Sequence, residues 1–280
     1  MPPIVKKTAL CTLISVFMIT FAVDRWKRAA LWRSAVTIGL RELMPSGMAV
    51  PIFTMLQSRR MKKIIYNKFD KNLITAMPVV SFPGRIITIM TPGEADRAVD
   101  YLLSHTILGV DTETRPAFKK GQNYKVALLQ VSTYDTCFLF RLNYIGVTPA
   151  IIRLLENRTV PMVGLSLNND LLSLHHRAEF TPGAFIDLQD EVGRIGVEDM
   201  SLQKLYANLF HQKISKRQRL TNWEADVLTD RQRMYAATDA WTCIKLYDEL
   251  CRLSRTGDYE LVIAPEPEPK PRANTKKTEQ

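Results

Sequence analysis

The fold is decided by residues 106–142, TILGVDTETRPAFKKGQNYKVALLQVSTYDTCFLFRL. Three apolar runs in this stretch, at residues 106–114, 125–133 and 136–142, have the length and the bounding polar residues of strands. A short YD turn is all that separates the second run from the third. The stretch therefore predicts three strands in an antiparallel meander.

Helices and buried strands alternate around this meander. Before it, Thr91 is an N-cap, Pro92 takes the first helical position and Glu94 completes a capping box, which predicts a helix to about Ser104. After it, the pattern predicts helices at residues 148–157, 168–178, 201–210 and 229–253, a strand at residues 160–166, and a strand or extended segment at residues 183–190. Such an order indicates an α/β domain with a mixed sheet.

The predicted domain covers residues 91–255, and residues 61–90 lead into it. Residues 256–280 include the Pro-rich, charged run APEPEPKPRANTKKTEQ. A segment so poor in large apolar residues cannot bury enough surface to fold, so we expect a disordered tail.

Residues 1–60 differ in composition from the rest of the chain. Residues 8–23 are an uncharged apolar run, shorter than the roughly 20 residues of a spanning helix. Two interpretations stay open. The run is a signal anchor, whose flanking positive charges would keep the domain in the cytoplasm, or residues 1–60 are not part of the native protein, which we favour because the pattern of one continuous domain begins at Met61. A cleavable signal is disfavoured because no A-x-A site follows the run.

The net charge of +10 lies in the N-terminal part of the chain. Residues 1–75 carry 13 Lys and Arg against 3 Asp and Glu, whereas residues 76–280 carry 25 against 25. The domain is therefore neutral and must hold any nucleic acid through local basic patches. The cysteines show no metal-ligand spacing, so we expect no disulfide, no zinc site and a reducing compartment; they are Cys11, Cys137, Cys243 and Cys251.

Acidic residues stand at two junctions early in the domain. Asp111 and Glu113 end the first strand of the meander, and the two-residue period of a strand puts both side chains on one face. Asp170 lies where a buried strand gives way to a helix, whose start Asn168 and Asn169 can cap. Each acid alone has an ordinary explanation, as a solvated strand end or a first-turn residue.

A further acid lies in the last helix, where Asp239 follows Tyr235 by one turn and projects from the same side. Taken together, an Asp and a Glu on the first strand, an Asp at a strand-to-helix junction and Tyr-x-x-x-Asp in the last helix resemble the motifs of the DEDD exonucleases. The tyrosine places the resemblance in the DEDDy branch of that superfamily.

The resemblance covers roughly residues 78–254. The run SLQKLYANLFHQKISKRQRLTNWEADVLTDRQRMYAATDAW is similar to a stretch shared by ribonuclease D and the exonuclease domain of the Werner syndrome helicase, including NW, LT and YAATDA. It implies a ribonuclease H-like fold, with a mixed central sheet flanked by helices, and 3′-5′ exonuclease activity. Ribonuclease D carries helical domains after its nuclease, so we expect this chain to be a stand-alone exonuclease domain.

The four acids also imply a cofactor. Carboxylates that converge in one cleft repel each other unless cations neutralise them, and oxygen ligands favour Mg²⁺ or Mn²⁺ over zinc. By resemblance, two such ions are held by Asp111, Glu113, Asp170 and Asp239. Tyr235 would orient the attacking water as its first role and accept a proton from it as its second. Hydrolysis would release nucleoside 5′-monophosphates from the 3′ end of DNA or RNA.

Basic segments at residues 115–125 and 211–219 flank these motifs and could hold phosphates, although solvated loops explain each segment equally well when taken alone. Gln130 should lie beside Asp111, where it could contact the terminal nucleotide or cap a polar group of the sheet. The candidate substrate-binding residues are Thr112, Gln130, Lys119, Lys120, Lys216 and Arg217.

Two other functions compete with a nuclease. A catalytically idle nucleic-acid-binding module on the same fold normally lacks a metal ligand, and here all four acids and the tyrosine are present. A membrane-tethered factor would depend on residues 8–23. We expect a cytoplasmic protein, with anchorage to the inner membrane through residues 8–23 as the alternative.

Overall fold

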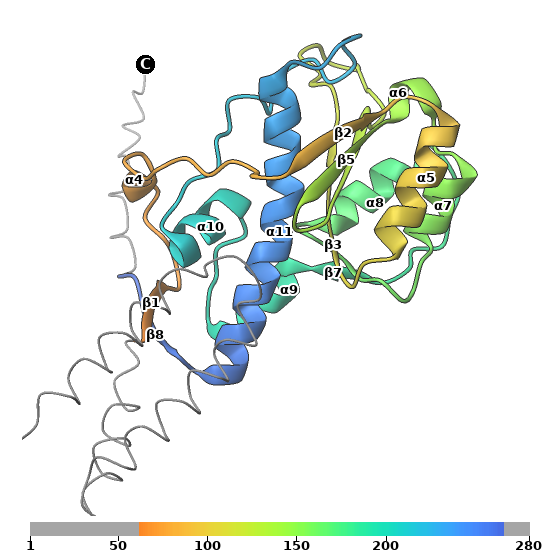
Figure 1. The fold of residues 1–280 in the computed structure, drawn as a ribbon. Helices are drawn as coiled ribbons and strands as arrows, with labels where there is room; N and C mark the ends of the chain where they lie inside the picture. Colours follow the sequence, from red (N-terminus) through yellow and green to blue (C-terminus); the bar gives the residue numbers. More distant parts are fainter. Residues whose placement is uncertain (1–61, 266–280) are drawn as a thin grey trace, which may run out of the picture. The chain divides into compact units, whose positions relative to one another are not determined.

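A computed structural model describes residues 62–265 (Figure 1). The candidate anchor at residues 8–23 and the end of the expected tail lie outside the described residues, so both interpretations of the N-terminal region stay predictions. None of the helices within residues 62–265 combines the length and the apolar character that a membrane span needs.

A six-stranded mixed sheet forms the centre of the described domain, with strand order β2-β5-β4-β3-β6-β7. The predicted meander is confirmed, because β4 pairs antiparallel with both β3 and β5. The remaining neighbours in this sheet pair in parallel. The strands are β2 (Arg85–Ile89), β3 (Leu108–Glu113), β4 (Leu128–Ser132), β5 (Thr136–Arg141), β6 (Met162–Gly164) and β7 (Phe185–Asp187).

Helices cover both faces of the sheet, and each face has its own apolar cluster (Figure 1). On one face pack α5 (Pro92–Leu103), α7 (Pro149–Leu155) and α8 (Leu167–His175). The long helix α11 (Asp230–Thr256) crosses the other face. The capping boxes predicted at Thr91 and Thr229 are both present.

Shorter elements complete the domain. Around the end of the meander and after β7 lie α6 (Leu142–Ile145), α9 (Leu188–Val192), the 3₁₀ helix η1 (Gly193–Ile195) and α10 (Leu202–Phe210). In the lead-in lies α4 (Lys71–Ile74), and β1 (Lys63–Tyr66) pairs in parallel with β8 (Tyr259–Val262).

Three strands, β1, β2 and β8, lie outside the predicted domain boundaries of residues 91–255. β2 belongs to the central sheet although the lead-in was expected to end at residue 90, and β8 lies in the segment expected to be a disordered tail. Tyr259 and Leu261 pack against the apolar core, which gives the start of that segment enough buried surface to order. Regular structure therefore extends past residue 255.

Candidate active site

The acids of β3 and the acid of α11 come together where α11 passes over β3. Asp111, Glu113 and Asp239 each offer a carboxylate oxygen, and these oxygens all lie within 4.8 Å of one another. Asp111 and Glu113 share a face because of the two-residue period of β3. Asp239 reaches them because α11 packs directly on that face.

Asp170 stands beside this group, in the first turn of α8. Strand β6 ends at Gly164, so β3 extends past it, and the Thr112 hydroxyl in the overhanging part of β3 donates a hydrogen bond to Asp170 Oδ1. The charge of Asp170 also acts on Asp111. Asp170 is thus a neighbour of the three-carboxylate group rather than a member of it.

The start of α8 is capped differently from our prediction. The helix begins at Leu167, so Asn168 and Asn169 lie inside its first turn and do not cap it. Instead, Asp187 at the end of β7 accepts hydrogen bonds from the backbone N–H groups of Ser166, at 2.9 Å, and Leu167, at 2.7 Å. The prediction was wrong because the capping group comes from a distant strand.

Burial raises the pKa values of all four acids, and repulsion by the neighbouring carboxylates adds to it at Asp111 and Glu113. Burial, together with the charges of Asp170 and Asp239, raises the pKa of Asp111 well above its usual range. Burial and the neighbouring carboxylates raise the pKa of Glu113 to about 10. Burial is also the main cause that raises the pKa of Asp239 to about 7 and that of Asp170 to about 6. So many charges cannot coexist here without a cation or bound protons.

Tyr235 lies beside the acids with 9% of its surface exposed. Its ring packs against the fully buried Trp223, with ring centroids 6.0 Å apart. Burial and the charges of Asp239 and Glu113 raise the pKa of the Tyr235 phenol, so the hydroxyl keeps its proton at neutral pH. It can therefore donate a hydrogen bond but is not a base.

A cavity of about 590 Å³ opens over Asp111 and Asp239. Its acidic wall meets a basic one: Arg219 lowers the pKa of Glu113 and Lys216 lowers that of Asp239, although burial outweighs both effects. The lining includes Asp111, Ser166, Lys216, Arg219, Tyr235 and Asp239. A negatively charged ligand can therefore approach these carboxylates only where positive charges offset their repulsion.

A family model described as 3′-5′ exonuclease matches residues 86–253, which hold all of these acids and the tyrosine. The chain belongs to the 3′-5′ exonuclease family. The resemblance to the exonucleases of ribonuclease D and the Werner helicase is thereby confirmed.

Known relatives agree with the family match. The bifunctional 3′-5′ exonuclease/ATP-dependent helicase WRN of Mus musculus is 27% identical over 65% of this chain, and a 3′-5′ exonuclease of Arabidopsis thaliana is 31% identical over 66%. The chain spans 14% of the mouse protein and 70% of the Arabidopsis protein. The structure is also similar to that of ribonuclease D from Escherichia coli, with a TM-score of 0.52 and 20% identity over 64% of this chain and 51% of that one, which confirms the ribonuclease H-like fold.

The residues of the site fit a divalent cation. The four acids provide oxygen donors only, which suits a hard cation such as Mg²⁺ or Mn²⁺. Asp239 Oδ1 is buried and has no hydrogen-bond partner among residues 62–265. Because a buried carboxylate oxygen without a partner is costly, this atom is in the position of an unused ligand.

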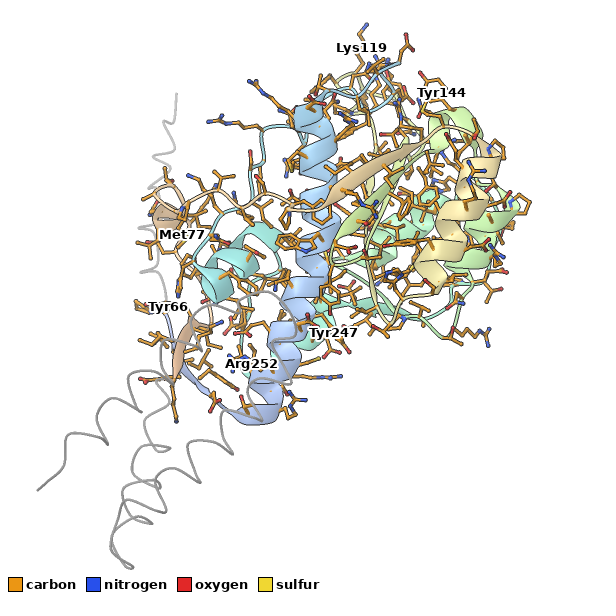
Figure 2. All side chains as sticks on the ribbon, in the orientation of Figure 1. Tyr66, Met77, Lys119, Tyr144, Tyr247 and Arg252 are labelled. Atoms are coloured by element: carbon orange, nitrogen blue, oxygen red, sulfur yellow. The ribbon has the colours of Figure 1, made fainter. Side chains whose placement is uncertain are left out.

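The basic residues predicted to contact substrate lie at different places in the structure. Lys216 lines the acid cavity, whereas the neighbouring Arg217 lines a second cavity, and Arg219 from the same segment lines the first. Lys119 and Lys120 are exposed in the loop between β3 and β4, and Figure 2 shows Lys119 at the end of the molecule where α11 begins.

Two predicted contacts lie in the sheet itself. Thr112 binds Asp170, as described above. Gln130 pairs opposite Asp111, as expected, but is fully buried, and its amide has no hydrogen-bond partner among the described residues. Its contact with a nucleotide stays a prediction.

Several lining residues of the acid cavity were not among the residues predicted from the sequence, and Ser166, Met200 and Cys243 are three of them. Ser166 adopts a left-handed conformation, with φ 62°, just before α8. Met200 precedes α10 and is 53% exposed at the cavity. Cys243 lies one turn beyond Asp239 in α11, and that spacing is the one signal in the sequence that could have indicated any of the three.

Proposed function

We propose that the protein is a metal-dependent 3′-5′ exonuclease that hydrolyses nucleic acid from the 3′ end to nucleoside 5′-monophosphates. One observation carries this proposal. Carboxylate oxygens of Asp111, Glu113 and Asp239 lie within 4.8 Å of one another, beside a cavity with a basic rim. Membership of the exonuclease family supports it.

Asp111, Glu113, Asp170 and Asp239 would hold two Mg²⁺ or Mn²⁺ ions. Ions bound there would lower the pKa of a coordinated water and neutralise the charge that develops on the phosphate and the leaving oxygen. The raised pKa values of Asp111 and Glu113 support this assignment, since burial and repulsion by the neighbouring carboxylates raise them and a bound cation offsets both effects.

Tyr235 would position the water that attacks the phosphorus. Its hydroxyl keeps its proton, so it orients the water by a hydrogen bond instead of removing a proton from it. Packing against Trp223 limits the motion of the ring, which supports a positioning role.

Lys216 and Arg219 would hold the phosphates of the strand at the rim of the cavity. Thr112, Gln130, Lys119, Lys120 and Arg217 stay proposed substrate contacts. The experiment below distinguishes DNA from RNA as the substrate.

The test is digestion of matched, 5′-labelled DNA and RNA single strands with Mg²⁺ or Mn²⁺, by the full chain and by Asp111→Asn. We expect a ladder that shortens from the 3′ end, that requires metal and that is lost in the variant. A ladder of equal strength in both proteins would assign the activity to a contaminant. Binding without cleavage by the unaltered protein would favour the idle nucleic-acid-binding module instead.

A further inference from the structure

A second cavity, of about 400 Å³, adjoins the acid cavity. The two cavities share Ile214 and Tyr235 as lining residues. The second is enclosed by the lead-in segment before β2, the segment between α10 and α11, and the first turns of α11. Its lining includes Val79, Ser81, Ile214, Arg217, Arg231 and Met234.

Residues 214–217 form a ridge between the two cavities. Lys216 lines the acid cavity and Arg217 lines the second one, so these two consecutive side chains lie on opposite sides of the ridge. Backbone hydrogen bonds tie the segment before the ridge to the lead-in, from Val80 N to Lys213 O at 3.0 Å and from Lys213 N to Pro78 O at 2.9 Å. The ridge is therefore anchored in place.

The second cavity offers positive charge that is free to bind a ligand. Within residues 62–265, neither the Arg217 nor the Arg231 guanidinium has an ion pair or a hydrogen bond. The acid at this cavity, Asp230, is already paired with Arg233. Free guanidinium groups of this kind match the geometry of a phosphate.

The cavity also offers apolar surface. Val79 is 54% exposed, and with Ile214 and Met234 it provides a wall on which a flat ring can rest. Gln218, Ser81 and Ser215 add polar groups at the same cavity. An apolar wall beside guanidinium groups is the combination that binds a base together with its phosphate.

We propose that this second cavity binds a nucleotide of the same strand whose 3′ end lies in the acid cavity, with Arg217 and Arg231 on its phosphate and Val79 and Met234 against its base. The inference rests on the proposed function. It also assigns a role to Val79 and Ser81, which precede the family-matched residues 86–253. A strand that leaves the acids across the Lys216–Arg217 ridge enters this cavity next.

The test compares the full chain with Arg217→Ala/Arg231→Ala, and with Arg158→Ala as the matched control. Arg158 is exposed between α7 and β6 and lines neither cavity. Binding of a fluorescent single strand with cleavage-resistant phosphorothioate linkages is measured by anisotropy over a range of salt. We expect binding to weaken about tenfold or more in the double variant, with a salt slope lower by about 0.7, because Arg217 and Arg231 share one phosphate and each neutralised phosphate on a single strand contributes about 0.7.

A second measurement follows hydrolysis of the p-nitrophenyl ester of thymidine 5′-monophosphate. Its single phosphate is the one that is hydrolysed at the acids, so it offers no phosphate to the guanidinium groups of the second cavity. We expect the single variant Arg231→Ala, whose residue is not among the proposed substrate contacts of the acid cavity, to hydrolyse this ester at the unaltered rate while binding the strand more weakly. Loss of this activity in parallel with strand binding would overturn the inference, because the substitution would then have damaged the catalytic site. Strand binding and a salt slope equal to those of the control would overturn it as well.

A third arm measures binding of free nucleoside 5′-monophosphate. Loss of that binding in the double variant, with strand binding retained, would mean that the cavity serves free nucleotides and would contradict the proposal. If the unaltered protein hydrolyses no substrate, the proposed function fails, yet the anisotropy measurement still decides this inference.

Discussion

A Cβ atom added to Gly109 would lie 2.0 Å from the carbonyl oxygen of Ala240. Gly109 is two residues before Asp111 on β3, and Ala240 directly follows Asp239 on α11. Helix and strand therefore approach each other closely next to the two acids that this contact brings together. Glycine at this position sets the spacing of the site.

Replacing Gly109 with Ala should therefore both destabilise the fold and separate the acids. We expect a loss of about 1–3 kcal/mol or more in the free energy of unfolding, because a side chain forced into a packed interface shifts backbone. Gly93→Ala is the control, since its Cβ would meet nothing nearer than the Arg97 side chain at 3.8 Å. Urea denaturation measures both, and equal stability of the two variants would contradict this role for Gly109.

Removal of the hydroxyl in Tyr235→Phe should lower the cleavage rate by about 10² or more, the usual range for a group that positions a proton transfer. Strand binding should change little, because the ring and its packing on Trp223 remain. The matched control is Tyr247→Phe, on the C-terminal half of the same helix (Figure 2). Unchanged turnover in Tyr235→Phe would remove this residue from the mechanism.

Without metal, the stability of the protein should fall as the pH rises, and metal binding should counteract this fall. The folded-state pKa of Asp239 is about 7 and that of Glu113 about 10, against ordinary values of 3.8 and 4.5. Without metal, the stability that these protonated groups contribute is fully present below about pH 4 and is lost as the pH rises through 7 towards 10. Thermal unfolding in EDTA should thus show the melting temperature falling between about pH 5 and pH 8.

Added Mg²⁺ should raise that melting temperature, and more so at the higher pH, because the acids must lose protons to bind the ion. Glu113→Gln is the control and should show a weaker fall in EDTA, since the amide cannot ionise. A metal-free protein whose stability rises steadily over this range would be inconsistent with the clustered acids.

Asp187 should affect stability and metal binding although it is neither a proposed metal ligand nor a proposed substrate contact. Asp187→Ala leaves the backbone N–H groups of Ser166 and Leu167 without their acceptor at the start of α8, the helix that carries Asp170. We expect a loss of about 1–2 kcal/mol in the free energy of unfolding, typical of a removed N-cap, together with weaker metal binding. Asp70→Ala, which uncaps the short exposed helix α4, should affect stability alone.

Local signals predicted most of the fold and part of the site. The capping boxes at Thr91 and Thr229 depend on residues three apart, and the pairing of Asp111 with Glu113 depends on the period of a strand, so neighbours in the sequence suffice for both. Asp187 capping α8 could not be predicted in this way, because donor and acceptor are some twenty residues apart.

The basic segment shows the same limit. The sequence predicted substrate contacts at Lys216 and Arg217, but these consecutive side chains line different cavities. Arg219 lines the acid cavity together with Lys216. The direction of each side chain depends on the backbone path of a loop that is tied to residues 78–80. Such a path has no repeating pattern that the sequence could reveal.

The central claim is that the four carboxylates share a pair of divalent ions, and anomalous diffraction from crystals grown with Mn²⁺ and a nucleoside 5′-monophosphate measures this directly. We expect two anomalous peaks about 3.5–4 Å apart, with oxygens of Asp111, Glu113, Asp170 and Asp239 as their protein ligands. Peaks bound elsewhere, or an Mn²⁺-saturated crystal with no peak at these side chains, would contradict it.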